Sequence, residues 1–174
     1  MKFGLLTLVF MMDPASRFFD TFDAGPQTQV MRRTLPRLDV PIYSCEKDNR
    51  VPGIELYPLN EVVSKMGCGY LNNTIAYAIA FAAYNEVGKI NMYGADFSYS
   101  TNVHFGEMGR GCCEFWLSKC MNKGIDVCIA ATSSLLDTNV SEKEKLYGYH
   151  RLEDPPVTYM ENGNLKTTQS SNVK

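Results

Sequence analysis

The stretch NNTIAYAIAFAAYNEVGKINMY (72–93) decides the fold class of this chain. Its first three residues have the side-chain oxygens that favour the start of a helix. Residues 75–87 are alanine-rich and apolar on nearly every face, which is typical of a helix buried inside a domain. Gly88 follows, where a helix end favours a positive φ, and residues 90–93 are a short apolar run. The stretch therefore predicts a buried helix that leads directly into a buried strand.

The same order recurs downstream. We expect a second helix over residues 107–122, Gly124 at its C-terminal end, and another buried strand over residues 125–131. Apolar strands that follow helices indicate a parallel sheet covered on both faces. The prediction is an α/β, doubly wound, mainly parallel Rossmann-like sheet with right-handed crossovers, in which ligands bind beyond the carboxyl ends of the strands.

The residues before this stretch predict shorter elements. The β-branched and apolar runs predict strands over residues 2–10, 17–22 and 40–44. Turn and cap signals predict helices over residues 27–33 and 61–66, the latter capped by Asn60. We divide the chain into a Rossmann-like domain, residues 1–138, and a polar C-terminal arm and tail, residues 139–174. The arm is expected to be ordered to about Tyr159 and to fray beyond it.

Composition excludes several classes of protein. The chain has 174 residues, of which 45% are hydrophobic and 21% charged, and its net charge is −2. Residues 1–87 hold 8 basic and 9 acidic side chains, and residues 88–174 hold 9 and 10. Because charge is even along the chain, we expect no nucleic-acid-binding arm. No apolar run reaches the ~18–20 residues of a membrane span, so we expect no membrane association and a cytoplasmic protein.

The N-terminal apolar run and the cysteines have plain interpretations. MKFGLLTLVFMM (1–12) is followed at once by Asp13 and Pro14, which favours a buried strand over a signal peptide. Cys112, Cys113 and Cys120 recur at helical spacing, so we expect the cysteines to be small buried hydrophobes. Neither histidine has a cysteine at zinc-finger spacing, and we predict no metal site.

The first candidate site is GADFSYSTNVHFGEMGR (94–110), which follows a predicted strand end. His104 is a candidate general base or acid, because an imidazole side chain can accept and release a proton in such reactions. Tyr99 has a hydroxyl that can donate to a phosphate oxygen, and Arg110 has a guanidinium that can pair with one. The structural alternatives are that Asp96 caps a turn and that Arg110 pairs with Glu107 or Glu114 along its helix.

Two further segments are candidate binding residues. Asn72, Asn73 and Thr74 open the buried helix, whose N-terminus favours a phosphate, and plain N-capping is the alternative. Ser133 and Ser134 end the last strand and could bond a base or ribose, with turn formation as the alternative. The sequence lacks GxGxxG, GxxxxGK[ST] and GxSxG, which argues against a conventional dinucleotide, kinase or hydrolase site.

Two runs carry a family resemblance: GYLNNTIAYAIAFAAYNEVGKINMYGADFSYS (69–100) and EFWLSKCMNKGIDVCIAATSSLL (114–136). In their order and spacing they resemble the motility accessory factor glycosyltransferase-like proteins and the 6-hydroxymethylpterin diphosphokinases, including short phage-encoded members. Bacterial sialyltransferases of related fold look similar over the same stretch.

The resemblance implies a transferase that uses a nucleotide-activated donor, a sugar nucleotide or ATP, with Mg²⁺ as a candidate cofactor. It implies a phosphate-binding role for Tyr99, one place after the family position, which Ser98 occupies. It implies that His104 deprotonates the acceptor and that Asp96 orients donor hydroxyls or the loop. A bacteriophage origin and action in the host cytoplasm follow from the same resemblance.

The sequence departs from the family pattern at its start. Members carry a first strand with a glycine-rich nucleotide loop, and this sequence begins with what looks like the second strand. Two hypotheses follow: a transferase for glycosyl or diphosphoryl groups, or a non-catalytic member that acts as a binding or accessory protein. A sheet that lacks an interior strand would be exposed, which makes a homodimer a further expectation.

Overall fold

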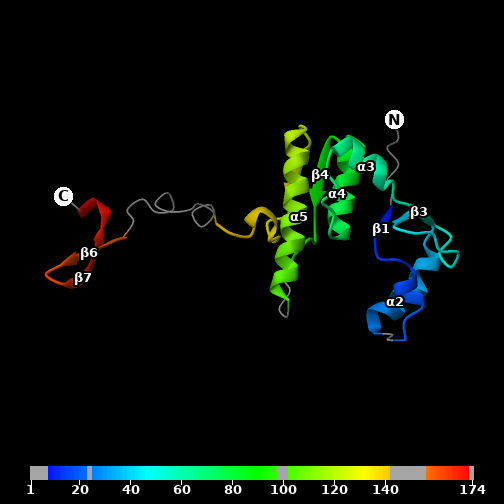
Figure 1. Ribbon diagram of the computed structural model, residues 1–174, viewed down its shortest axis with the longest axis horizontal. Coiled ribbons are helices and arrows are strands. Elements are labelled where there is room, and N and C mark those ends of the chain that lie inside the picture. Colours follow the sequence, from blue (N-terminus) through cyan, green and yellow to red (C-terminus); the bar gives the residue numbers. More distant parts are fainter. Residues whose placement is uncertain (1–7, 23–24, 98–101, 142–155, 173–174) are drawn as a thin grey trace.

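The first half of the chain builds a small parallel sheet. The computed structural model describes residues 8–22, 25–97, 102–141 and 156–172 (Figure 1). The sheet has the order β1-β2-β3, from β1 (Val9–Met11), β2 (Ile42–Ser44) and β3 (Ile54–Leu56). Between β1 and β2 lie α1 (Ser16–Phe19), α2 (Pro26–Thr34) and the 3-10 turn η1 (Leu35–Arg37).

The second half alternates helices with a second parallel pair of strands. Its elements are α3 (Leu59–Met66), α4 (Thr74–Tyr84), β4 (Lys89–Met92), α5 (Val103–Asn122), β5 (Asp126–Ile129) and the 3-10 turn η2 (Leu135–Asp137). β4 pairs with β5 in parallel, with Ile90 opposite Val127. The helix–strand–helix–strand order predicted from the sequence is therefore confirmed.

Local signals explain most helix boundaries. The Asn73 side chain caps α4 by accepting a hydrogen bond from the Ala76 amide at 3.0 Å. Gly124 follows α5 with φ +80°, as predicted. Two predicted caps are wrong, those at Gly88 and Asn60. α4 ends at Tyr84, because Glu86, at φ +55°, adopts the left-handed conformation before the chain reaches Gly88. α3 begins at Leu59 after Pro58, so Asn60 lies inside it.

The second sheet is covered on one face only among the described residues. Ile90, Met92, Val127 and Ile129 pack against the core that α3, α4 and α5 build around Trp116. The alternate residues of the two strands, Lys89, Asn91, Asp126 and Cys128, are exposed. The prediction that both strands are buried on both faces is therefore wrong, and the apolar side of the sheet faces the helices seen beside β4 in Figure 1.

An aromatic cluster joins the two sheets. Phe10 of β1 and Tyr43 of β2 stack at 5.6 Å, and both contact Phe81 of α4, at 5.5 and 4.7 Å between ring centroids. Tyr57 closes the cluster and donates a hydrogen bond to the Tyr77 carbonyl at 3.0 Å. The described residues thus form an α/β structure with two small parallel sheets, without a strand ladder between β1 and β4.

The strand predicted over residues 17–22 is wrong, because residues 16–19 form α1. The side chain of Phe18, in this helix, is buried, whereas that of Phe22 is fully exposed. The helix is held by contacts from outside it: the Arg50 guanidinium lies 4.8 Å from the Phe19 ring centroid and pairs with Asp20 at the helix end. No local pattern in the sequence predicts these contacts.

The C-terminal residues contain an antiparallel hairpin, β6 (Pro156–Glu161) with β7 (Asn164–Gln169). Asn162 and Gly163 both have positive φ, at +51° and +78°. This is the backbone of the type I′ turn that Asn-Gly favours. The prediction of fraying beyond Tyr159 is therefore wrong, and the Asn-Gly pair is the signal that could have identified the hairpin.

Candidate functional site

A cleft of about 450 Å³ lies at the carboxyl ends of β1 and β2, beside the start of α4. Its position is the one that α/β folds use for ligands. Met12 and Asp13 follow β1, Cys45 follows β2, and α4 contributes its first turn. The full lining is Met12, Asp13, Arg17, Cys45, Leu71, Asn72, Asn73, Thr74, Ile75, Tyr77, Phe97 and Phe105.

The start of α4 gives one side of the cleft a positive character, and the Arg17–Asp13 ion pair lies in the same lining. The N-terminus of the 11-residue helix α4 opens onto the cleft, and the first turn of α4 holds no acidic side chain. Helix N-termini present amide N–H groups and a positive dipole end. Arg17 is the cationic residue of the lining, pairs with Asp13, and keeps 66% of its side chain exposed. Because a guanidinium has five donors, Arg17 can hold Asp13 and still bind a ligand oxygen.

Asn72 and Asn73 line the cleft while fastening α4 to α5. The Asn72 amide donates to the Met108 carbonyl at 3.1 Å, and the Asn73 amide donates to the Gly109 carbonyl at 3.1 Å. The Cys113 thiol approaches the Asn73 side-chain oxygen at 3.3 Å. Burial raises the pKa of Cys113 to about 12, so this thiol is un-ionised near neutral pH and acts as a packing group. The cap and the tether account for most of the hydrogen-bonding capacity of Asn73.

A smaller recess of about 70 Å³ adjoins the cleft. Its lining is Asn72, Asn73, Phe97, Phe105, Met108 and Gly109, four of which also line the cleft. A Cβ atom on Gly109 would lie 3.0 Å from the Phe97 ring, so the absence of a side chain lets this ring pack directly on α5. The recess is therefore bounded by aromatic, thioether and glycine surfaces, with two asparagines at its edge.

Arg110 lies in a separate cluster, where it pairs with Glu107 along its helix, the structural alternative given by the sequence. It bonds Glu107 at 2.9 Å, Asp137 at 3.0 Å and the Ser134 carbonyl at 3.3 Å. The carboxylates of Glu107, foremost, and of Glu114 and Asp137 raise the pKa of Arg110. The guanidinium thus ties α5 to the turn after β5 and is not part of the cleft lining.

Ser133 and Ser134 belong to the same turn. The buried Ser133 hydroxyl donates to the Ala95 carbonyl at 2.5 Å and accepts from the Leu135 amide at 3.2 Å. The Ser134 hydroxyl accepts from the Phe97 amide at 3.4 Å. These contacts hold the loop after β4 against the turn after β5, and so position Phe97 at the cleft.

The remaining predicted residues are dispersed. His104 is exposed in the first turn of α5, and Asp96 is exposed in the loop after β4. Neither lines the cleft, although the neighbours Phe97 and Phe105 do. Ser98 and Tyr99 lie outside the described residues. The structure thus brings Asn72, Asn73 and Thr74 to the cleft and leaves His104, the predicted base, and Asp96, the predicted orienting residue, outside its lining.

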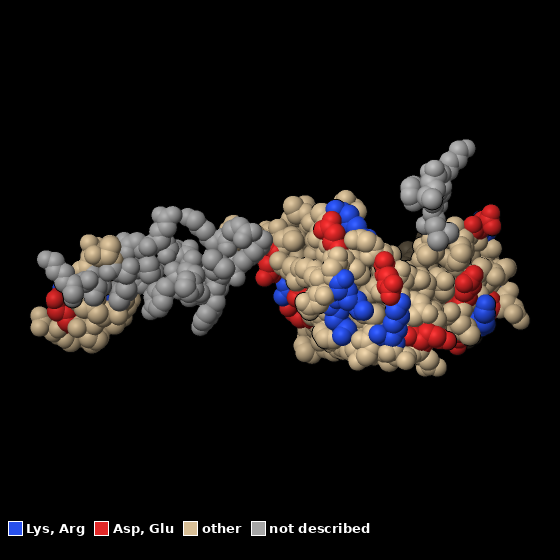
Figure 2. Space-filling model, turned by 90° about the horizontal axis from the view of Figure 1, so that it is seen from above, with Lys and Arg blue, Asp and Glu red and all other residues tan. Residues whose placement is uncertain are grey.

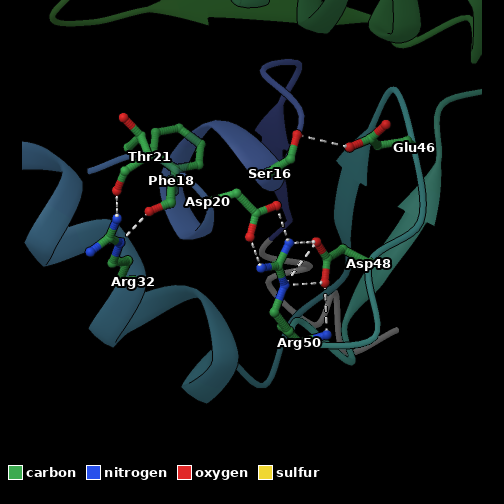
Figure 3. A network of polar contacts seen from close by, with 8 residues as sticks. All are labelled: Ser16, Phe18, Asp20, Thr21, Arg32, Glu46, Asp48 and Arg50. Atoms are coloured by element: carbon green, nitrogen blue, oxygen red, sulfur yellow. Dashed lines mark hydrogen bonds and ion pairs between the residues drawn. The ribbon is translucent and has the colours of Figure 1, made fainter. Parts of the chain in front are cut away.

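Arg50, which no motif in the sequence identifies, holds α1, the helix that contains Arg17. Figure 3 shows the Arg50 guanidinium between Asp20 and Asp48, with Arg32 directed at the carbonyls of Phe18 and Thr21. The Arg50–Asp48 bond is 2.6 Å, and it lowers the pKa of Asp48 to about 2. This network fastens α1 to the loop between β2 and β3 and thereby sets the position of Arg17.

Other site classes find little support in the described parts of the chain. Residues 8–22, 25–97, 102–141 and 156–172 contain no cluster of three or more His, Cys, Asp or Glu side chains able to hold a metal ion. Basic and acidic side chains are interspersed over the face seen in Figure 2. None of the helices described is both long and apolar enough to cross a bilayer.

Comparison with known proteins identifies no relative of this chain. No family model, no curated protein and no solved structure matches the chain.

Proposed function

We propose that this chain binds a phosphorylated small molecule in the strand-end cleft. The observation that carries the proposal is the convergence of Arg17 with the N-terminus of α4 on one cleft. Its volume, about 450 Å³, lies within the range of ~300–1,000 Å³ that small-molecule sites occupy. Thr74 adds a hydroxyl beside the amide groups of the first turn.

The doubly wound Rossmann-like arrangement is part of this proposal. In it, β4 and β5 continue the sheet from the free side of β1, and the cleft occupies the point where the strand order reverses. The aromatic contact of Phe10 in β1 with Phe81 in α4 supports this placement, since it brings the strand next to the helix that leads into β4.

Within the proposal we favour ligand binding without catalysis. Group transfer needs a proton-transferring group within hydrogen-bond reach of the ligand. Asp13 is the carboxylate among the lining residues described, and it is paired with Arg17. Transfer of a glycosyl or diphosphoryl group, with His104 as base and Mg²⁺ bound with the nucleotide, is the second hypothesis and rests on the family resemblance.

Thermal unfolding against phosphate, ATP, GTP, CMP, UDP and sugar nucleotides, each with and without Mg²⁺, tests the proposal. A ligand at a hundred times its Kd adds about 2.7 kcal/mol to the unfolding free energy. For a chain of this size that raises Tm by roughly 5–10 °C. Arg17→Ala should weaken binding about tenfold or more, since hydrogen bonds to charged groups contribute ~1.5–3 kcal/mol.

Arg33→Ala is the matched control, because it removes an exposed arginine of α2 that is not part of the lining. It should leave binding unchanged. Absence of a shift with every phosphorylated ligand, or equal weakening by the two arginine variants, would contradict the proposed function. Turnover of a bound donor that is lost in His104→Ala would favour the transferase hypothesis.

A further inference from the structure

We propose that the recess beside the cleft binds a short apolar end, two or three carbons long, of the phosphorylated ligand. This inference rests on the proposed function and extends it from the phosphate to the other end of the molecule. The recess and the cleft share Asn72, Asn73, Phe97 and Phe105, so one small molecule can contact both.

The chemistry of the recess is apolar. The Asn73 amide donates to the Gly109 carbonyl and to the Asn72 side-chain oxygen, and the Asn72 amide donates to the Met108 carbonyl. The rest of the lining consists of ring, thioether and glycine surfaces. Phe105 is 55% exposed and Met108 is 50% exposed at the rim. An apolar ligand group that covers them removes this surface from water.

The size of the recess limits the group. A cavity of about 150 Å³ holds a benzene ring, and one water occupies a share of about 30 Å³ in the liquid. A recess of about 70 Å³ therefore takes two or three carbon-sized groups and is too small for a nucleobase. The Phe97 ring against Gly109 forms one wall, because a Cβ at Gly109 would have to displace it.

A series of phosphate monoesters tests this inference on the full chain. Inorganic phosphate, methyl, ethyl, n-propyl and phenyl phosphate are titrated while amide NMR shifts are followed at Thr74, beside the cleft, and at Gly109, in the recess. Affinity should rise up to about fourfold for each carbon from methyl to propyl, as burial of a methylene allows. Phenyl phosphate should bind no more tightly than propyl phosphate, and Gly109 should shift only with the longer esters.

Met108→Ala should flatten the dependence on chain length while retaining phosphate binding, because the Asn72 bond to residue 108 uses its backbone carbonyl. Met121→Ala is the matched control, a similarly exposed methionine of α5 outside the recess, and should retain the dependence. Arg17-dependent phosphate binding with equal affinity for all alkyl esters would overturn the recess and keep the proposed function. No binding of any phosphate, or binding that Arg17→Ala leaves unchanged, would overturn both.

Discussion

Two buried serines contribute to the stability of the fold with opposite sign. Ser44, in β2, is fully buried, and among the residues described its hydroxyl has no hydrogen-bond partner. Ser133 is also buried, but its hydroxyl bonds the Ala95 carbonyl and the Leu135 amide. A buried polar group without a partner lowers stability, whereas a paired one supports it.

We therefore predict stability changes of opposite sign for the two alanine variants. Ser44→Ala should raise the unfolding free energy by about 1 kcal/mol, because it removes an unsatisfied hydroxyl. Ser133→Ala should lower it by about 1–3 kcal/mol, because it leaves a buried carbonyl and a buried amide unpaired. Urea unfolding of the two variants beside the natural chain measures both, and a loss of stability in Ser44→Ala would contradict the prediction.

Asp48 makes the stability of the chain depend on acid. Its hydrogen bonds from Arg50 lower the pKa of the folded carboxyl to about 2, from an ordinary value of 3.8. Since the folded pKa is the lower one, the stabilisation is complete above about pH 5 and is lost as the pH falls toward 2.

Asp48→Asn should therefore lower stability at neutral pH and reduce the decline between about pH 5 and pH 2. Chemical denaturation at a series of pH values follows this decline. Asp39→Asn, which removes an exposed carboxylate outside the Arg50 network, should keep the shape of the natural profile. An unchanged profile in Asp48→Asn would show that the ion pair does not contribute.

At the scale of the element, α5 carries two glycines with different surroundings. At Gly109 a Cβ would meet the Phe97 ring at 3.0 and 3.2 Å, whereas at Gly111 it would enter open space. Both lie inside a 20-residue helix, where alanine is favoured over glycine by about 1 kcal/mol.

Gly111→Ala should accordingly stabilise the chain by roughly 0.5–1 kcal/mol. Gly109→Ala should be destabilising by up to about 2 kcal/mol, since overpacking costs ~1–3 kcal/mol and helix propensity offsets about 1 kcal/mol of that. Differential scanning calorimetry of the two variants gives the comparison. Equal stabilisation by both would mean that Phe97 does not pack on α5.

Elements with strong local signals could be predicted, and those held by distant contacts could not. α2, α4 and α5 follow from Pro26, the Asn73 cap and Gly124, which act within one turn of the helix they bound. The four residues of α1 have no such signal, so the sequence predicts a strand there. Their helix depends on contacts with Arg50, more than thirty positions away. The hairpin has a local signal in the sequence, the turn-forming pair Asn162-Gly163.

At the scale of the whole molecule, the aromatic cluster of Phe10, Tyr43, Tyr57 and Phe81 connects the two sheets. If it couples them, both halves unfold in one transition. Trp116, buried in the core of the second half, reports on that half by fluorescence, while far-UV circular dichroism reports on the whole chain. Coincident transitions are the test of a single cooperative unit.

Phe81→Ala should lower the unfolding free energy by about 2 kcal/mol, below the ~3–5 kcal/mol of a fully buried phenylalanine because Phe81 is only partly buried, and both signals should shift together. Phe22→Ala should change it by less than about 0.5 kcal/mol, because Phe22 is fully exposed. If the dichroism transition moves in Phe81→Ala while Trp116 fluorescence does not, the two sheets belong to separate units.

In the candidate site too, some residues could be predicted from local sequence signals, and others are placed by contacts with distant parts of the chain. Asn72, Asn73 and Thr74 could be predicted, because strand ends and helix starts meet at one edge of an α/β sheet. Arg17 could not, because its position depends on α1 and on the Arg50 network. Arg110, Ser133 and Ser134 had two interpretations each from the sequence, and the contacts in the structure match the structural ones.

The sequence by itself determined the α/β class, the order of helix and strand in the second half, and the helix start at Asn73. These follow from apolar periodicity and capping, which act over a few neighbouring residues. The tertiary structure alone decided which polar groups are occupied by structural bonds, which face of β4 and β5 is exposed, and that Arg17 shares a cleft with α4. Those outcomes depend on contacts between residues far apart along the chain, whose partners are set by packing and which leave no local pattern in the sequence.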